Sequence, residues 1–383
     1  MTRPAPLEGV LVADFSRVLA GPLMTVMLAD LGAEVIKVER PETGDETRAW
    51  GPPWTDESST YFECANRSKK SITLDLQDPD DLAAARELAA RADVVVENFK
   101  AGTMARFGLD YPSVKRTNPR VVYCSISGFG SGEGADLPGY DFLVQAVGGL
   151  MSITGPADGP PMKVGVALVD VLTSKDAVIG VLAALAARDR DGQGQHIEVN
   201  LLSSLLGSLV NQASAYLWTG RAPTRLGNRH PSIAPYETLT CRDGIIAVCC
   251  GNDGQFRRCV TELGAPALAD DPRFATNADR VAHRSELVAE LESLLARDTA
   301  DSWIKRLTKA GVPAGKVGDL ADAFSLAERL GLAPTVSVGQ GHAPQVRHPI
   351  QYSDSPVTRY CPPPRLGEHT DEIRRWLTTK ETR

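Results

Sequence analysis

The stretch GVLVADFSRVLAGPLMTVMLADLGAEVIKVER, residues 9–40, decides the expected fold. Residues 9–15 are a short Val-rich apolar run, which is typical of a buried strand. Residues 21–33 have the apolar spacing of a helix, with Pro22 in a favourable first-turn position. Residues 34–40 indicate a second strand. Together these patterns predict a strand, helix and strand in succession, the unit from which parallel sheets are built.

The same alternation continues along the chain. An Ala-rich helix leads into a Val strand within residues 81–99, and residues 120–130 add a strand that ends in a Gly loop. Residues 171–188 have a clear helical pattern, and residues 194–217 indicate a strand running into another helix. Alternating helices and strands favour a parallel sheet covered by helices. We therefore predict an α/β fold.

The composition changes near residue 220. Residues 219–237 are rich in Pro, Gly and Arg and lack periodicity, as in a linker. A new strand and helix follow at 243–264, and residues 284–307 are strongly amphipathic. We predict a large domain over residues 1–225 and a smaller α/β domain over residues 226–330. A tail follows, with a short helix capped near Thr370.

The net charge, the lengths of the apolar runs and the cysteine and histidine spacings argue against several classes of function. The net charge of -7, with Lys and Arg spread along the chain, argues against nucleic-acid binding. No apolar run approaches the ~20 residues that span a bilayer. Seven cysteines without a C-x-x-C pair, and an opening MTRPAPLEG without signal-peptide character, predict a reduced, cytoplasmic protein. The six histidines lack H-x-x-H or H-E-x-x-H spacing, so no metal site is predicted.

Asp170 is the most informative acidic residue. It follows an apolar run and precedes the helix predicted at 171–188. Burying a carboxylate is costly unless it is paired or used in chemistry. The simpler interpretation is a helix N-cap, which is compatible with catalysis because helix N–H groups would hold the carboxylate in place. Asp176, further along the helix, is the rival acid and fits a side-face residue better.

Arg40 stands where a strand–helix–strand unit faces a bound ribose. The G-x-G-x-x-G fingerprint of dinucleotide-binding proteins is absent. An Arg at this position favours a ribose phosphate, and coenzyme A carries one. With Lys37 and Arg48, Arg40 would form an anion site; the alternative is that all three are solvated surface charges.

Four residues follow predicted strands or turns and are candidates for a binding crevice. Asn98 and Arg106 lie just beyond the strand of the 81–99 unit, where the carboxyl ends of parallel strands form such crevices. Asn98 is equally well explained as a turn or cap residue. Tyr140 and Asp141 fit either a functional role or a simple turn.

The loop CCGNDGQF, residues 249–256, combines a strand end with flanking glycines. Such a loop can approach a ligand closely or move as a lid. The alternative is a plain strand-to-helix turn with Asp253 as the helix cap.

Many segments in one order resemble the class III CoA-transferase family, which includes formyl-CoA transferase and the carnitine and bile-acid CoA-transferases. The resemblance spans essentially the whole chain and rests on residues 6–48, 71–76, 92–111, 118–130, 138–155 and 363–372. It implies a Rossmann-like large domain completed by residues 331–383, which return to it after the small domain. It also implies that two subunits thread through each other as an interlocked homodimer.

The resemblance further implies a site and its chemistry. Asp170 matches the catalytic aspartate, which attacks an acyl-CoA to give a mixed anhydride and then an aspartyl-CoA thioester. Acyl-CoA and a carboxylic acid are the substrates, without a tightly bound cofactor. The covering loop of the family matches Gly251, Gly254 and Gln255. Positions around CoA match Val18, Ala20, Arg40, Leu74, Asn98, Arg106 and Tyr140.

Two departures from formyl-CoA transferase argue against formyl or oxalyl specificity: Leu19 replaces a Gln, and the loop GNDGQ differs from the Gly-rich lid. A third departure, Pro138 or Gly139 where a Lys contacts CoA, implies that this CoA contact is lost. We expect a pocket less polar than one for oxalate.

The main alternative is an α-methylacyl-CoA racemase, whose His–Asp pair moves a proton; Tyr140 stands at the position of that His and is a poor base at neutral pH. A non-catalytic CoA-binding protein and an NADP-dependent dehydrogenase are further alternatives. The dehydrogenase lacks its glycine fingerprint.

Overall fold

The protein is described over residues 3–379 by a computed structural model, in which it forms two units. Unit 1 contains the chain up to Leu150, the stretch Lys163–Arg221 and the chain from Ala333 onward. Unit 2 contains Met151–Met162 and Ala222–Leu332. Unit 1 is therefore assembled from three separate stretches of sequence.

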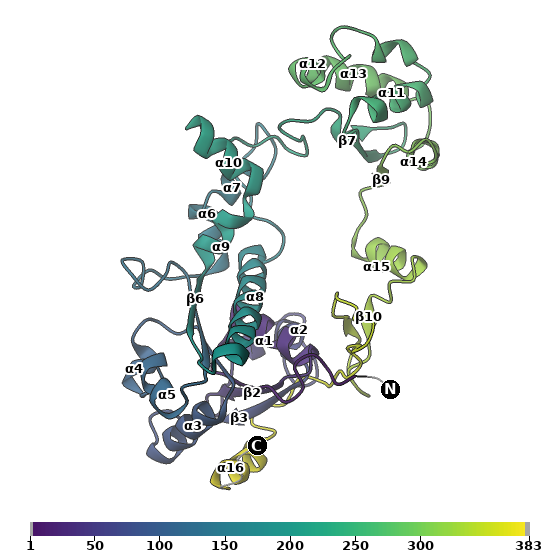
Figure 1. Cartoon of the computed structure of the whole chain (residues 1–383). Helices are drawn as coiled ribbons and strands as arrows, with labels where there is room; N and C mark the ends of the chain where they lie inside the picture. Colours follow the sequence, from purple (N-terminus) through teal and green to yellow (C-terminus); the bar gives the residue numbers. More distant parts are fainter. Residues whose placement is uncertain (1–2, 380–383) are drawn as a thin grey trace. The chain divides into compact units, whose positions relative to one another are not determined.

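Unit 1 is built on a six-stranded parallel sheet with the order β3-β2-β1-β4-β5-β6 (Figure 1). Its strands are β1 (Leu11–Asp14), β2 (Glu34–Glu39), β3 (Lys69–Thr73), β4 (Val94–Glu97), β5 (Val122–Ser127) and β6 (His196–Asn200). This is the strand order of doubly wound nucleotide-binding sheets, and it confirms the predicted α/β fold. The order reverses between β1 and β4, which is where such sheets bind ligands.

The central strands β1 and β4 are apolar on both faces, so helices cover both. Val12 and Val96 belong to one buried cluster, with helices α1 (Ala20–Asp30), α8 (Leu168–Asp191) and α9 (Leu201–Ser208). Ala13 and Val95 belong to the other, with α3 (Pro79–Arg91), α5 (Tyr111–Thr117) and α16 (Thr370–Thr378). Successive residues of one strand thus enter opposite cores, as the pleat of a strand requires.

Shorter elements complete unit 1. They are the 3-10 helix η1 (Glu46–Ala49), α2 (Thr60–Asn66), α4 (Thr103–Arg106), α6 (Asp141–Val147), α10 (Val210–Thr219) and the antiparallel pair β10 (Thr335–Val336) and β11 (Gln345–Val346). Helix α7 (Leu150–Ile153) lies where the chain passes into unit 2. Within residues 3–379, no helix is both long and apolar enough to cross a membrane.

The returning C-terminal segment covers the outer edge of β3. The His369 N–H donates to the Ser71 carbonyl over 2.9 Å. The Thr73 N–H donates to Thr370 Oγ1 over 3.1 Å. These bonds satisfy backbone groups that an edge strand otherwise leaves open.

The structure confirms the strands and helices predicted within residues 9–40, 81–99 and 120–130. Two details differ. Strand β3 was not predicted, because Ile72 is its single large apolar residue. The helix expected within 194–217 is two helices, α9 and α10, which break at Val210 with a φ of 41°.

Unit 2 contains a three-stranded antiparallel sheet with the order β7-β8-β9. Its strands are β7 (Tyr236–Thr240), β8 (Ile245–Cys249) and β9 (Ala314–Lys316). Its helices are α11 (Asp253–Glu262), η2 (Pro266–Ala269), α12 (Asn277–Ala282), α13 (Arg284–Leu295), α14 (Ala300–Lys309) and α15 (Leu320–Arg329). Helices and strands are both present, as expected of the smaller domain, but its strands are antiparallel.

Residues 151–162 were expected in the large domain but belong to unit 2. The reason is a set of hydrogen bonds to the chain after residue 221. Arg225 Nε donates to the Gly159 carbonyl over 3.1 Å, and the Gly227 N–H donates to the Gly155 carbonyl over 3.1 Å.

Arg280 anchors unit 2. Its fully buried guanidinium donates to the carbonyls of Ala234 (2.7 Å) and Phe274 (2.9 Å) and pairs with Asp253 (2.6 Å). Arg280→Ala leaves buried carbonyls without partners, so we expect a loss of about 3 kcal/mol in the free energy of opening unit 2.

Native-state amide exchange in α11 and α13 measures this loss. Arg257→Ala, which removes an exposed Arg paired with Asp270, is the control and should change the opening free energy by less than about 0.5 kcal/mol. Equal opening energies in Arg280→Ala and wild type would contradict the anchoring role.

Candidate active site

A cavity of about 590 Å³ opens beyond the carboxyl ends of β4 and β5 in unit 1. Five of the predicted site residues line it: Val18, Ala20, Asn98, Tyr140 and Asp170. Leu19, the position of the expected departure, lines it as well. The fold therefore brings together residues from four separate parts of the sequence, at the edge where doubly wound sheets bind ligands.

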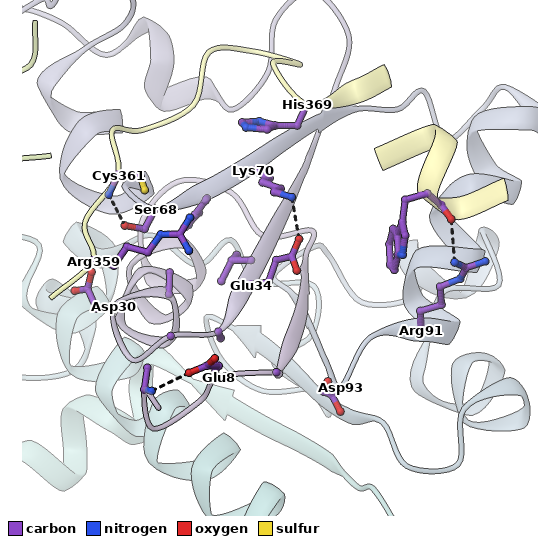
Figure 2. A pocket seen from close by; sticks show the side chains of 18 of the residues that line it. Glu8, Asp30, Glu34, Ser68, Lys70, Arg91, Asp93, Arg359, Cys361 and His369 are labelled. Carbon is purple, nitrogen blue, oxygen red and sulfur yellow. Dashed lines mark hydrogen bonds and ion pairs between the residues drawn. The ribbon is translucent and has the colours of Figure 1, made fainter. Parts of the chain in front are cut away.

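A larger cavity of about 1600 Å³ lies at the opposite, amino-terminal ends of the strands (Figure 2). Charged residues line it, and several are paired with each other: Lys70 Nζ lies 3.1 Å from Glu34 Oε1, and Arg91 Nε lies 2.6 Å from Glu87 Oε1. None of the predicted site residues lines this cavity. The smaller cavity is therefore the candidate active site.

Asp170 lies in the first turn of α8, two residues after the helix begins at Leu168. The N-cap interpretation was wrong, because the cap position is Ala167. Asp170 is half-buried, and within residues 3–379 no hydrogen bond reaches its carboxylate. Burial, and then the nearby charge of Asp141, raises the pKa of Asp170 to about 7. The rival Asp176 is exposed on the same helix.

Asp141 performs the capping that the sequence assigned to Asp170. Its Oδ1 accepts the Val169 N–H over 2.8 Å and lies 3.4 Å from the Asp170 nitrogen, while Oδ2 accepts Gln145 Nε2 over 2.7 Å. Gln145 is fully buried and in turn accepts the Val164 N–H over 2.9 Å. Asp141 thus fixes the backbone that carries Asp170, a role that a carboxylate at a helix N-terminus favours.

Asn98 holds a turn of the backbone. Its Oδ1 accepts the Arg17 N–H over 2.9 Å, and its Nδ2 donates to the Arg17 carbonyl over 2.7 Å. One turn after Asp170, the Ser174 hydroxyl lies 2.7 Å from both the Ala20 carbonyl and the Asp170 carbonyl. These contacts join the turn before α1 to the helix that carries Asp170.

The other predicted CoA contacts do not line the cavity. Arg40 is exposed at the end of β2, Arg106 is exposed at the end of α4, and Leu74 is buried in a core cluster. The predicted anion site of Arg40 with Lys37 and Arg48 is wrong. Lys37 is buried against Asp45, and Arg48 pairs with Glu39, because both cations neutralise acids inside the fold.

The loop residues Gly251, Gly254 and Gln255 belong to unit 2. Gln255 Oε1 accepts the Gly251 N–H over 2.8 Å, and Asn252 Oδ1 accepts the Gln255 N–H over 2.9 Å. Asn252 is therefore the cap of α11, and the expectation that Asp253 caps it was wrong. Asp253 instead pairs with Arg280.

Sequence reasoning missed Tyr61, on α2. Burial raises the pKa of Tyr61 to about 12, with the charge of Asp170 as the next cause. Its ring meets Trp50 edge to face, with centroids 5.3 Å apart. Tyr61 belongs to no spacing motif, so only the folded chain places it near Asp170.

Comparison with known proteins decides the family. A family model described as CoA-transferase family III matches residues 7–370. The chain belongs to this family. Among its family III relatives, the succinate–glutarate CoA-transferase of Agrobacterium fabrum is 45% identical, over 99% of this chain and 97% of that protein. The acetyl-CoA:oxalate CoA-transferase of Acetobacter aceti is 40% identical over the same shares.

A solved structure agrees with these matches. A CAIB/BAIF family protein from Brucella suis has a TM-score of 0.87 and 46% identity, over 98% of this chain and 100% of that chain. The family III resemblance predicted from the sequence is confirmed. The protein is an enzyme, a CoA-transferase, and its substrates are a CoA thioester and a carboxylic acid.

Replacing Asp141 should lower the pKa of Asp170. Asp141→Asn keeps an oxygen for the helix N–H groups but removes the negative charge, so the pKa should fall below about 7. A carbon NMR titration of aspartate-labelled protein measures it. Asp176→Asn is the control and should leave the pKa unchanged. The same pKa in Asp141→Asn and wild type would show that the Asp141 charge is not a cause.

Asp170 should also make stability depend on pH. Its raised pKa means that the folded protein keeps a proton that the unfolded chain releases, so stability falls as pH rises from about 4 to about 7. Asp170→Asn should therefore be about 2 kcal/mol more stable than wild type near pH 8 and nearly equal near pH 4. Urea unfolding at both pH values tests this. A difference independent of pH would contradict it.

Proposed function

We propose that this CoA-transferase moves CoA between dicarboxylic acids of the succinate and glutarate type, through a covalent intermediate on Asp170. The observation that carries the proposal is a half-buried carboxylate in the cavity, with no hydrogen bond to that carboxylate among residues 3–379 and a pKa raised to about 7. An oxygen nucleophile needs free lone pairs, and a carboxylate kept from cations and hydrogen bonds retains them.

The reaction then proceeds in balanced steps. The Asp170 carboxylate attacks the thioester carbonyl, the carbon–sulfur bond breaks, and CoA leaves as a thiolate with a mixed anhydride behind it. The thiolate attacks the Asp170 carbonyl of that anhydride, which releases the donor acid and forms an aspartyl-CoA thioester. The acceptor carboxylate attacks this thioester, and the same steps run in reverse. Covalent catalysis divides one difficult exchange into easier steps.

Backbone N–H groups at the start of α1 stabilise the oxyanion that forms at each attack. Leu19 and Ala20 line the same cavity as Asp170, and no side chain caps α1. Such groups are most effective where water is excluded. In this proposal Val18, Asn98 and Tyr140 border the CoA chain, Arg40 and Arg106 meet its phosphates, and Leu74 lies beneath it. Gly251, Gly254 and Gln255 form the cover that excludes water.

The choice of acids has two supports. The relative with 45% identity is named for succinate and glutarate. Leu19 places an apolar side chain in the cavity, which suits an acid with a methylene chain better than oxalate. The racemase alternative is disfavoured, because Tyr140 occupies the position of its His and the matched relatives are named CoA-transferases.

The enzyme functions in the cytoplasm as an interlocked homodimer in this proposal. Helix α10 supports the dimer, because Val210, Leu217 and Trp218 expose 70%, 81% and 91% of their surfaces. Apolar patches of this kind mark protein interfaces. All seven cysteines are free, which fits a reducing compartment.

Intact-protein mass spectrometry tests the mechanism. With succinyl-CoA or glutaryl-CoA we expect a CoA adduct that hydroxylamine removes, with the scar mapping to Asp170. Asp170→Asn should lose the adduct and at least about 10³-fold in kcat. Asp176→Asn, which removes the exposed acid on the same helix, should keep both.

Two outcomes would contradict the proposal. Absence of any adduct, together with deuterium exchange at the acyl α-carbon in heavy water, would favour the racemase. Transfer to oxalate alone from a panel of acids would refute the proposed substrate class.

A further inference from the structure

Val18 adopts a backbone conformation that its side chain disfavours. Its φ is 69°, in the left-handed region, and Val is β-branched. Such residues persist only where the surrounding structure holds them, and they gather at functional sites. Val18 lies in the turn before α1 and lines the cavity that contains Asp170. Something must hold this turn in place.

A buried ion pair lies directly against the turn. The Val18 N–H donates to Asp45, 3.2 Å from Oδ2 and 3.3 Å from Oδ1. Lys37 Nζ lies 2.9 Å from Asp45 Oδ2 and donates to the Ser16 carbonyl over 2.9 Å. Both charged side chains are fully buried. The pair thus holds the peptide groups on both sides of Arg17, whose own N–H and carbonyl bind Asn98.

The turn before α1 is also joined to the backbone that carries Asp170. The Ser174 hydroxyl contacts the backbone carbonyls of Ala20, where α1 begins, and of Asp170. A shift of the turn therefore moves this wall of the cavity relative to the Asp170 carboxylate. Other partners satisfy these charges as well, since Asp45 also accepts the Thr47 N–H over 2.9 Å. A purely structural ion pair could lie at many places in the core. The Lys37–Asp45 pair instead accepts the N–H of Val18, the one non-glycine residue with a positive φ among those of residues 3–379 that line the cavity.

We propose that Lys37 and Asp45 are positioning residues, which hold Val18 in its strained conformation and so place the Leu19 and Ala20 N–H groups for the oxyanion beside Asp170. This inference rests on the proposed function. It replaces the sequence-based expectation of Lys37 as part of a surface anion site. A misplacement of about 1 Å at such groups is enough to cost about 10²-fold in rate.

The test compares two double variants that each neutralise one buried ion pair. Lys37→Met with Asp45→Asn removes the pair at the turn without leaving an uncompensated charge. The matched control, Arg67→Met with Asp30→Asn, removes a buried pair (2.6 Å) at the far end of α1, away from the turn. Amide exchange of the peptide around Val18 is read first, because it does not depend on activity. The kcat of CoA transfer and the KM for acyl-CoA are read next.

We expect amide exchange around Val18 at least about tenfold faster in the Lys37–Asp45 variant, with kcat reduced about 10- to 100-fold and KM changed less than about threefold. The control variant should change neither the exchange nor kcat. Val18→Gly removes the steric penalty of the left-handed backbone at position 18. Because the turn then no longer needs the Lys37–Asp45 pair to stay in this conformation, neutralising the pair in the Val18→Gly background should lower kcat by less than about threefold.

Several results would overturn the inference: unchanged exchange around Val18, an equal loss of kcat in the control variant, or the same loss of kcat with Gly at position 18. If the wild type transfers no CoA, the proposed function fails. The exchange rates then still decide whether the pair holds the turn.

Discussion

A carboxylate kept partly out of water without a cation beside it is the constraint around which the active site is built. The two Lys and Arg residues that line the cavity are already paired, Arg17 with Glu46 and Lys100 with Asp136. Asp141 adds a second negative charge and draws the first N–H groups of α8 to itself. The absence of a free cation among those of residues 3–379 that line the cavity and the nearby charge of Asp141 both raise the free energy of the ionised Asp170. Asp170 is therefore a better nucleophile, at a cost in folding stability.

Two other cations of this part of the fold, Lys37 and Lys69, do not line the cavity. Lys37 pairs with Asp45, and Lys69 lies 3.1 Å from Asp14, all fully buried. Burial lowers the pKa of Lys69 to about 8. Buried ion pairs of this kind add little to stability but fix geometry, since their hydrogen bonds are directional. Here the geometry they fix is that of the turn from Ser16 to Ala20.

The strands and helices around the site were largely predictable from the local sequence pattern. The Val-rich runs and the spacing of residues 21–33 identify strands and a helix because burial on two faces leaves few alternatives. The roles of polar residues were not predictable in this way. Lys37 carries the same charge on a surface or in a core, and only the partner Asp45 distinguishes the two. Asp141 and Asp170 are 29 residues apart, and their exchange of roles at the α8 terminus depends on how α6 packs.

The covered edge of β3 has a consequence for biosynthesis. The chain that closes this edge, at His369 and Thr370, lies almost 300 residues after the strand itself. During translation, the edge of β3 therefore stays open until the whole of unit 2 and the C-terminal segment have been synthesised. Unpaired strand edges promote association between nascent chains. The lone large apolar residue and the lysines of β3 keep that edge polar during the wait, so the weak strand pattern that hid β3 from sequence analysis also protects the unfinished protein.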